Sequence, residues 1–342
     1  MDIKTLDVYF REGMRGYPLF VFVHGLGMDK NVWVCPERSR VLAGSYPVNV
    51  MLSRPPQSKV VSSREPLPLI TTGEHRQGEL RTLFHDLTAL DIPCLSFTLQ
   101  RPANRVVHAI NDLLCILDVC KDYTRHGVVI VGHSRGGVIA RWFAESVAEA
   151  PVLGVVAISA PNEGSTLARW ATVLSRFTSL VLPYLNEAER GSFLSKIRGS
   201  FSFLGSKAVR EMLPGSDFIR SLARKPAKKF FMMTIGATRA ELLSLYKVQS
   251  TPCNDNDNRM VTYKKLLSIP ETMSKLLATL LPEGLAPEEI TDGLGDGIVS
   301  ERSSRVPYAD RHLVYPLNHV EVLFDETVRT DILAELKQQG FI

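Results

Sequence analysis

The sequence predicts a doubly wound α/β fold, in which helices cover both faces of a mostly parallel sheet. Short apolar runs rich in β-branched residues alternate with segments whose apolar residues recur at helical spacing. This alternation is typical of strand–helix–strand units. A second observation is the run at 127–132, which leads into a glycine-flanked serine and then into helix-like sequence. Ligands of such sheets bind at the carboxyl ends of the strands, where this serine would lie.

The first half of the chain supplies the elements in order. Pro18–Gly27 is almost wholly apolar, which suits a strand buried on both faces. Residues 28–73 are rich in proline and serine with little periodicity, so we expect an irregular excursion over the surface. The patterns that follow predict helices at 79–90, 104–123 and 138–145. They predict strands at 92–97, at 127–132 directly before the serine, and at 152–160.

The second half departs from the alternation at 166–227. This segment has helical patterns and an apolar stripe from Trp170 to Leu185, so we expect a helical cap inserted in a single domain spanning 1–342. An ordinary helical layer packed on the sheet explains the same pattern. The sheet pattern resumes at 229–236, and a last strand is expected at 312–315.

Residues 249–289 lack a clear period, and we expect a second irregular region there. Its run of Asn and Asp at 254–258 lacks the glycine and the distal glutamate of a calcium-binding loop, which favours a solvated loop. We therefore expect no metal site.

Composition narrows the class of protein. Apolar residues make up 45% and charged residues 22% of the 342 residues, as in ordinary globular proteins. A formal charge of +4 gives no indication of nucleic-acid binding, and the basic cluster at 220–229 fits a solvated helix end. None of the five cysteines forms a C-x-x-C pair. Without a signal-peptide core or a membrane-length apolar run, we expect a cytoplasmic protein.

Ser134 lies between Gly132 and Gly136 in a G-x-S-x-G motif. A serine on so tight a strand-to-helix turn takes a strained backbone conformation, and side chains at the glycine positions would collide with the strand and the helix. The turn lifts the hydroxyl clear of the sheet edge. Taken alone, a glycine-rich turn of this kind also suits phosphate binding.

Nucleophilic acyl transfer also needs a base, a group that orients the base, and donors for the oxyanion. His319 is the last histidine and follows the expected last strand, so its loop can return over the sheet edge. The acid should lie between serine and histidine, where the glycine-rich loop 291–300 offers Asp292 and Asp296.

Four segments of the chain carry a family resemblance, and in chain order they are His24–Gly27, Gly132–Gly137, Asp296–Val299 and His319–Leu323. Together they resemble the α/β-hydrolases, and within that fold the bacterial triacylglycerol lipases and GPI-inositol-deacylase-like proteins. Two further stretches, Ser159–Ser165 and Leu213–Ile219, resemble lipase segments, although Asn162 stands where those lipases usually have histidine. The resemblance runs roughly from Leu19 to Phe324.

The resemblance implies a triad of Ser134 as nucleophile, His319 as general base and Asp296 as acid. The family pattern Asp-Gly-hydrophobic-Val fits Asp296, whereas Asp292 is followed by a different sequence. The resemblance further implies an oxyanion hole made by the backbone N–H groups of Leu26 and Arg135.

Two other histidines then have supporting roles, His24 in orienting the loop after the first strand and His133 in packing beside the elbow. The resemblance implies no cofactor. Lipases of this kind sometimes carry calcium, which the sequence does not decide.

The sequence therefore predicts a serine esterase or lipase that acts in lipid metabolism and cleaves carboxylic esters through an acyl-enzyme on Ser134. Its partner would be a small-molecule ester or lipid substrate, and no nucleic acid is expected. The cap could make transient contact with a membrane surface. Two alternatives stay open: an acyltransferase that uses the same acyl-enzyme, and a hydrolase-fold protein that binds without turnover. Acyl length, alcohol moiety and oligomeric state are not determined by the sequence.

Overall fold

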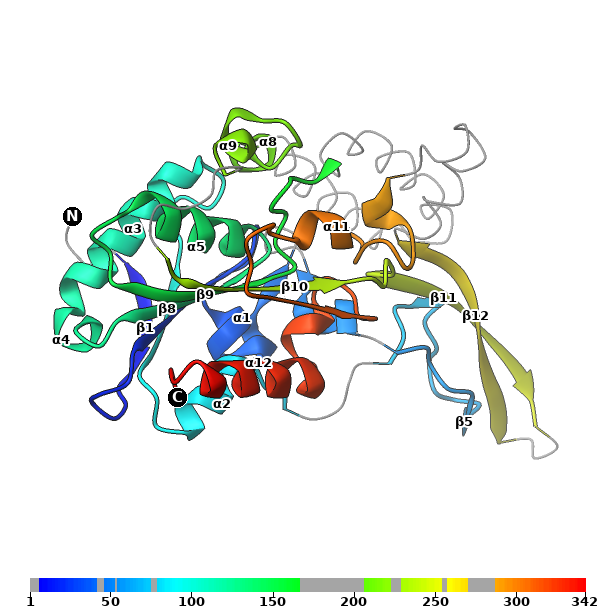
Figure 1. Cartoon of the computed structure of the whole chain (residues 1–342). Coiled ribbons are helices and arrows are strands. Elements are labelled where there is room, and N and C mark those ends of the chain that lie inside the picture. Colours follow the sequence, from blue (N-terminus) through cyan, green and yellow to red (C-terminus); the bar gives the residue numbers. More distant parts are fainter. Residues whose placement is uncertain are drawn as a thin grey trace.

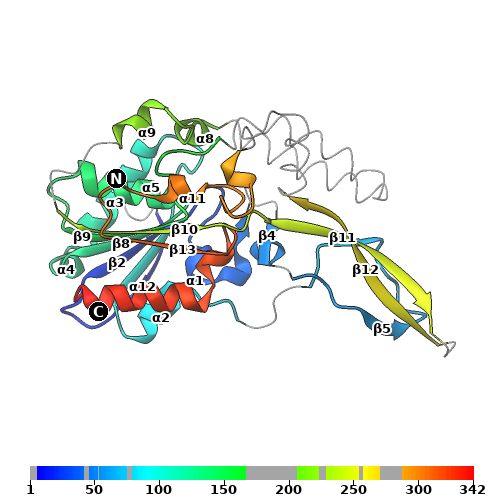
Figure 2. The same ribbon diagram turned by 45° about the vertical axis from the view of Figure 1, so that its right-hand side comes forward.

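The centre of the protein is a seven-stranded sheet with the order β1-β7-β2-β8-β9-β10-β13 (Figures 1 and 2). All strands except β1 run in parallel. The strands are β1 (Asp7–Arg11), β2 (Leu19–Val23), β7 (Cys94–Thr98), β8 (Val128–His133), β9 (Val152–Ile158), β10 (Phe231–Ala237) and β13 (Arg311–Tyr315). This computed structural model describes residues 6–41, 46–52, 54–74, 79–166, 206–222, 229–253, 257–269 and 287–342.

Helices cover both faces of this sheet, as the alternation predicts (Figure 1). One face carries α3 (Val106–Val119) and α5 (Arg135–Ser146). The predicted helix over 104–123 is divided, since a short α4 (Lys121–Thr124) follows α3. The other face carries α1 (Asn31–Val34), α2 (Leu83–Ala89) and the C-terminal α12 (Glu326–Gln338).

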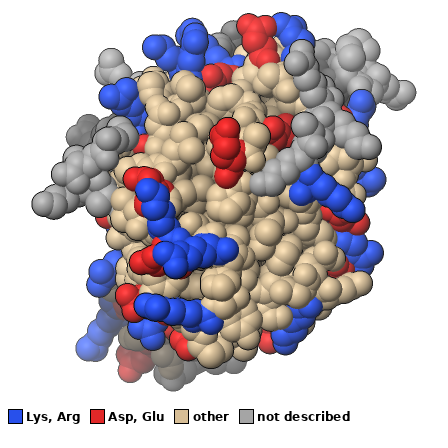
Figure 3. Space-filling model, turned by 60° about the vertical axis from the view of Figure 1, so that its left-hand side comes forward, with Lys and Arg blue, Asp and Glu red and all other residues tan. Residues whose placement is uncertain are grey.

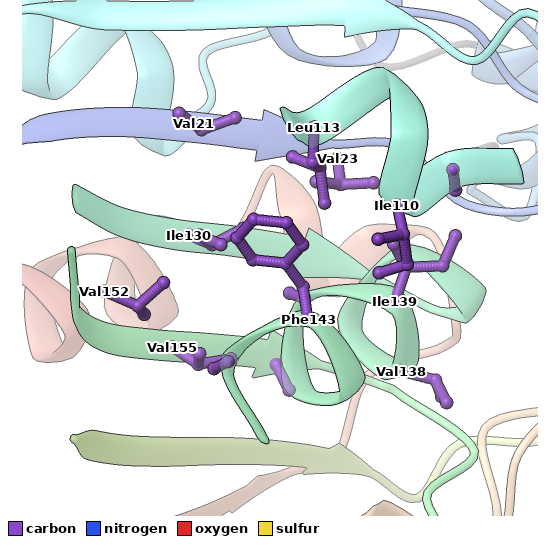
Figure 4. Packing of buried hydrophobic residues seen from close by; sticks show 14 of the residues in the cluster. Val21, Val23, Ile110, Leu113, Ile130, Val138, Ile139, Phe143, Val152 and Val155 are labelled. Carbon is purple, nitrogen blue, oxygen red and sulfur yellow. The ribbon is translucent and has the colours of Figure 1, made fainter. Parts of the chain in front are cut away.

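Two apolar cores lie between the sheet and these helices. The side chains of β2 alternate between them, with Val21 and Val23 in one core and Phe20 and Phe22 in the other. Because both faces are covered, the strand is apolar at every position, which is why the sequence shows a continuous run. Figure 4 shows Phe143 of α5 in the first core, close to side chains of the neighbouring strands.

A second sheet projects from the body, and we call it the arm (Figures 1 and 2). It is antiparallel with the order β5-β12-β11-β6. Its strands are β5 (Lys59–Ser62), β6 (Ile70–Thr71), β11 (Leu243–Pro252) and β12 (Asn258–Ile269).

The arm corrects two expectations. Irregular chain was predicted over 28–73 and 249–289, but these stretches contain β5, β6, the end of β11 and all of β12. The first also contains α1, η2 (Pro36–Arg38), β3 (Arg40–Val41), β4 (Tyr46–Pro47) and η3 (Val48–Leu52). The arm was missed because its apolar residues show no sustained period: long parts of β11 and β12 face solvent, and a register shift at Leu245/Tyr246 breaks the alternation.

The expected cap at 166–227 is described only at Thr166 and at 206–222. There, α8 (Lys207–Glu211) and α9 (Asp217–Ser221) pack on the body. Met212, Ile219 and Leu222 join the core beneath α3 and α5, as in an ordinary helical layer. The Trp170–Leu185 stripe and most of the 220–229 cluster lie outside the described residues, as do residues 254–256 of the Asn and Asp run.

No helix in the described part of the chain combines the length and the apolar character that crossing a membrane requires.

We predict that two adjacent leucines of α3 differ sharply in their contribution to stability. Leu113 is 0% exposed in the core, whereas Leu114 is 42% exposed. Leu113→Ala should lower the free energy of unfolding by about 2–5 kcal/mol because it leaves a cavity. Leu114→Ala is the matched control and should change it by about 0.5 kcal/mol. Urea unfolding measures both, and equal losses would contradict the packing described here.

Candidate active site

Ser134 forms the turn between β8 and α5, with φ 55° and ψ −127°. A Cβ on Gly132 would lie 2.4 Å from the Gly136 carbonyl carbon, and one on Gly136 would lie 2.4 Å from the Val23 carbonyl oxygen. The Ser134 N–H donates to the Ile158 carbonyl at 2.8 Å, which fastens the turn to β9. The strained elbow and its need for glycine, both predicted from the motif, are therefore confirmed.

Asp296 and His319 form a buried pair at the edge of the sheet. His319 Nδ1 donates to Asp296 Oδ2 at 2.8 Å, and both side chains are about 1% exposed. The His319 backbone N–H also donates to the Asp296 carbonyl, at 3.0 Å. Two hydrogen bonds from one residue fix the position of the imidazole and place its proton on Nδ1, which leaves Nε2 to accept a proton.

Two backbone N–H groups also donate to the Asp296 carboxylate. Its Oδ1 accepts from the backbone N–H groups of Ile298 at 3.0 Å and Val299 at 2.8 Å. Asp292, the other carboxylate of this loop, is exposed and accepts from the Ala240 N–H at 3.2 Å. Of the two aspartates, only Asp296 bonds to the histidine in the described chain, which agrees with the choice that the resemblance implied.

His133 links the serine turn to His319. Its Nε2–H donates to the His319 carbonyl at 2.8 Å, and the two rings lie 4.7 Å apart between centroids. His133 directly precedes Ser134 in the chain, so the residue next to the candidate nucleophile contacts His319. Within the described residues no hydrogen bond joins the Ser134 hydroxyl to His319, a contact that often tightens only when substrate binds. The expected packing of His133 beside the elbow is confirmed.

The two predicted oxyanion donors lie at the same turn. Gly25 sits against the serine, since a Cβ built there would be 3.1 Å from the Ser134 Cβ, and Leu26 follows it. Arg135 is the first residue of α5, so its N–H belongs to the helix N-terminus. Among the described residues neither the Leu26 nor the Arg135 N–H has a protein acceptor. Both donors are therefore available to an anion.

His24 holds the loop after β2, as expected. Leu99 N–H donates to His24 Nε2 at 3.0 Å, so the ring proton is on Nδ1, which donates to the Gly25 carbonyl at 2.8 Å. Burial lowers the pKa of His24 to about 4. The pKa of His133 is also held well below its usual value, first by burial and then by the neighbouring His319. Both rings are neutral at pH 7.

Arg135 contributes a side chain as well as its backbone. The guanidinium donates to the carbonyls of Pro102 at 3.0 Å and Asn104 at 2.6 Å, which fixes the loop before α3. Burial lowers the pKa of Arg135 to about 10, so it remains charged at neutral pH.

Asn318 is a positioning residue that the sequence reasoning missed. Its side-chain oxygen accepts from Val320 and Glu321 N–H, and its amide nitrogen donates to the Met51 and Glu241 carbonyls. The Glu321 carboxylate accepts from the Asn318 N–H in return, at 3.2 Å. This reciprocal pair has the hydrogen-bond pattern of a capping box, just before the short helix Glu321–Leu323. The spacing Asn318-x-x-Glu321 was the signal that could have revealed it.

The segment after β9 is fastened to the loop that carries Asp296. Asn162, which replaces the usual lipase histidine, donates to the Ser304 carbonyl at 2.9 Å. Ser165 Oγ donates to the Ile298 carbonyl at 2.7 Å. Asn162 therefore holds the chain that follows the Asp296 loop, and among the described residues its side chain bonds to neither Ser134, Asp296 nor His319.

Beyond the acid loop lies a cavity of about 350 Å³, bordered by Thr166 and Glu289 among others, but neither Ser134 nor His319 lines it. No group of three or more His, Cys, Asp or Glu side chains that could hold a metal ion occurs in the parts of the chain that the structure describes.

Comparison with known proteins places the chain in a family. Residues 79–263, more than half of the chain, match the family described as a domain of unknown function, DUF7379. The chain belongs to this family. No curated protein matches its sequence.

Two solved structures show what the fold of this DUF7379 chain resembles. The lipase BlEst2 from Bacillus licheniformis in mature form has 14% identity and a TM-score of 0.52, covering 96% of this chain and 97% of that one. Its propeptide form has 16% identity and a TM-score of 0.51, covering 96% of this chain and 53% of that one. Such identities show the fold alone, and the predicted α/β-hydrolase fold is confirmed.

We predict that His24 makes the stability of the DUF7379 chain depend on pH. Its pKa is about 4 when folded and 6.5 in the unfolded chain, so the unfolded state binds more protons between these values. The contribution of His24 is complete above pH 6.5 and is lost as the pH falls to about 4, by about 3 kcal/mol at most.

The measurement is urea unfolding of wild type and His24→Asn between pH 7.5 and 4. His24→Asn is less stable at pH 7.5, and the difference should shrink as the pH falls. A difference that stays constant over this range would contradict a buried neutral His24.

Proposed function

We propose that this chain is a serine hydrolase that cleaves carboxylic esters, with Ser134 as nucleophile, His319 as general base and Asp296 as the residue that orients it. One observation carries the proposal: His133 links the buried Asp296–His319 pair to the turn of a strained serine. Beside this serine are two N–H groups without a protein acceptor among the described residues. Nucleophile, base, orienting acid and oxyanion donors are the four parts that acyl transfer requires.

The first half of the reaction forms the acyl-enzyme. The Ser134 oxygen attacks the ester carbonyl carbon while His319 Nε2 takes the hydroxyl proton. The carbonyl oxygen becomes an oxyanion, stabilised by the N–H groups of Leu26 and Arg135; one such donor contributes about 10²–10³ in rate. The intermediate then collapses, the bond from carbon to the alcohol oxygen breaks, and His319 returns its proton to the leaving alcohol.

The second half releases the acid. His319 takes a proton from water, whose oxygen attacks the acyl carbon through a second oxyanion. The bond to the Ser134 oxygen breaks, the proton returns to the serine, and a carboxylic acid leaves. Throughout, Asp296 stabilises the positive charge on the His319 imidazolium through the 2.8 Å bond.

We further propose that the substrates are lipid-type esters. The likeness in fold to a lipase supports this, as does the apolar stripe from Trp170 to Leu185 in the sequence of the predicted cap. An apolar cap would hold acyl chains beside Ser134 and could touch a membrane surface transiently.

The nucleophile is tested with a fluorophosphonate probe, which labels activated serines covalently. Wild type should be labelled and Ser134→Ala should not, because the attacking oxygen is missing. Ser159→Ala is the matched control: Ser159 directly follows the neighbouring strand β9, is buried and also has a positive φ, of 47°. It should be labelled as wild type is. Labelling that persists in Ser134→Ala refutes the assigned nucleophile.

The acid is tested by two substitutions in one loop. Asp296→Asn should lower kcat for a p-nitrophenyl ester by about 10⁴, because an amide favours the wrong tautomer of His319. Asp292→Asn should change kcat less than about threefold, because Asp292 is exposed and surface substitutions usually have small effects. Loss of turnover in Asp292→Asn alone would reverse the assignment.

A further inference from the structure

The arm begins at the edge of the main sheet that carries the candidate active site. β10 runs parallel to β9, and β9 to β8, so the carboxyl ends of all three strands lie at one edge. Ser134 follows β8 at this edge, and β11 starts only a few residues after β10 ends. The arm then extends away from the body (Figures 1 and 2).

The root of the arm contacts both catalytic loops. The Gly293 N–H donates to the Thr238 carbonyl at 2.7 Å. Asn318, next to His319, donates to the Glu241 carbonyl at 3.1 Å. These bonds hold the chain just before β11 against the loops of Asp296 and His319, so the arm starts beside the candidate active site.

The strands of the arm carry charge of one sign. β5, β6, β11 and β12 contain no Asp or Glu. By contrast, Figure 3 shows basic and acidic side chains mixed on the face of the body turned away from the arm. The arm strands hold five basic residues, Lys59, Lys247, Arg259, Lys264 and Lys265.

Two of these lysines lie directly opposite each other. Lys247 of β11 pairs in register with Lys264 of β12, and both are exposed. Like charges in this arrangement destabilise a sheet. Among the ion pairs of the described residues none includes either lysine, whereas Lys265 binds Glu241 at 2.7 Å. The fold therefore gives no reason for this pair, which would be stabilised by an external anion.

Apolar side chains share the face of the two lysines. Met260 lies four residues from Lys264 along β12, on the same side of the sheet, and it is 37% exposed. Val60 of β5 is opposite Met260 and 55% exposed. Gln249, Thr251 and Thr262 occupy the remaining paired positions between them. We call the face with Val60, Lys247, Met260 and Lys264 the arm face.

We propose that the arm face docks on an anionic lipid bilayer and holds the candidate active site beside it. Lysines attract anionic headgroups while exposed apolar side chains enter the interface. The paired positions of this face include no aromatic side chain on which nucleic-acid bases could stack, which favours a lipid over a nucleic-acid partner. The inference that the bilayer supplies substrate rests on the proposed ester hydrolysis, whereas binding of the arm face to the bilayer does not.

The test is flotation of the full chain with vesicles. Wild type should float with phosphatidylcholine vesicles that contain about one third phosphatidylserine, should stay behind with phosphatidylcholine alone, and should be released as salt screens the attraction. Lys247→Gln with Lys264→Gln should lower the partition coefficient on the order of 30-fold, from two lost basic groups. Its thermal stability should not fall, because an opposed like-charge pair is removed.

The matched control is Lys121→Gln with Arg125→Gln, which removes the same charge at and just after α4, at the far end of the body (Figure 1). It should float as wild type does. Equal losses in both double variants, or equal flotation with neutral and anionic vesicles, would overturn the proposal.

Ser134→Ala separates this proposal from the proposed function. It should float like wild type, because docking needs no turnover. A wild-type protein that floats but does not hydrolyse esters refutes the function alone. One that hydrolyses a soluble ester but never floats refutes the docking alone.

Discussion

The close approach of α5 to the ends of β2 and β8 determines the arrangement of the whole candidate site. Gly132 and Gly136 have no room for a Cβ against each other's backbone or that of Val23. This crowding forces Ser134 into a positive φ and leaves the Arg135 N–H pointing from the helix end. It also brings His133 against Gly25 and His319. One backbone contact thus positions the proposed nucleophile, the proposed oxyanion donors and the histidine that contacts the proposed base.

Burial affects the ionisable side chains around this turn in different ways. Three N–H groups, from Ile298, Val299 and His319, donate to the buried Asp296 carboxylate and replace the water that it loses in the interior. His24 and His133 have lowered pKa values and stay neutral, so neither opposes the positive charge that His319 would carry during the proposed reaction. Both instead serve through hydrogen bonds to backbone atoms, which need no charge.

The body was predictable from the sequence because its strands are buried on both faces. The continuous apolar runs that became β2, β8 and β9 carry a strong local signal, as does the glycine spacing around Ser134. The convergence of Asp296 and His319 depends on contacts far apart in the chain, and ordered motifs rather than periodicity anticipated it. Asn318 has one local signal, its spacing to Glu321, because its other side-chain partners include Met51 and Glu241, which become neighbours only in the folded protein.

The arm was not predicted from the sequence because its strands are exposed to solvent over much of their length, and this exposure also indicates how the arm functions. A sheet solvated along much of its length needs few apolar residues and is held by interstrand hydrogen bonds, so its sequence is free to vary on the outside. Stability would favour Thr or an opposite charge across from Lys247. Lys264 stands there instead, with no acidic residue in any of the four strands. Packing does not require this pair and pairing rules disfavour it, which supports the proposal that an anionic surface binds the arm from outside.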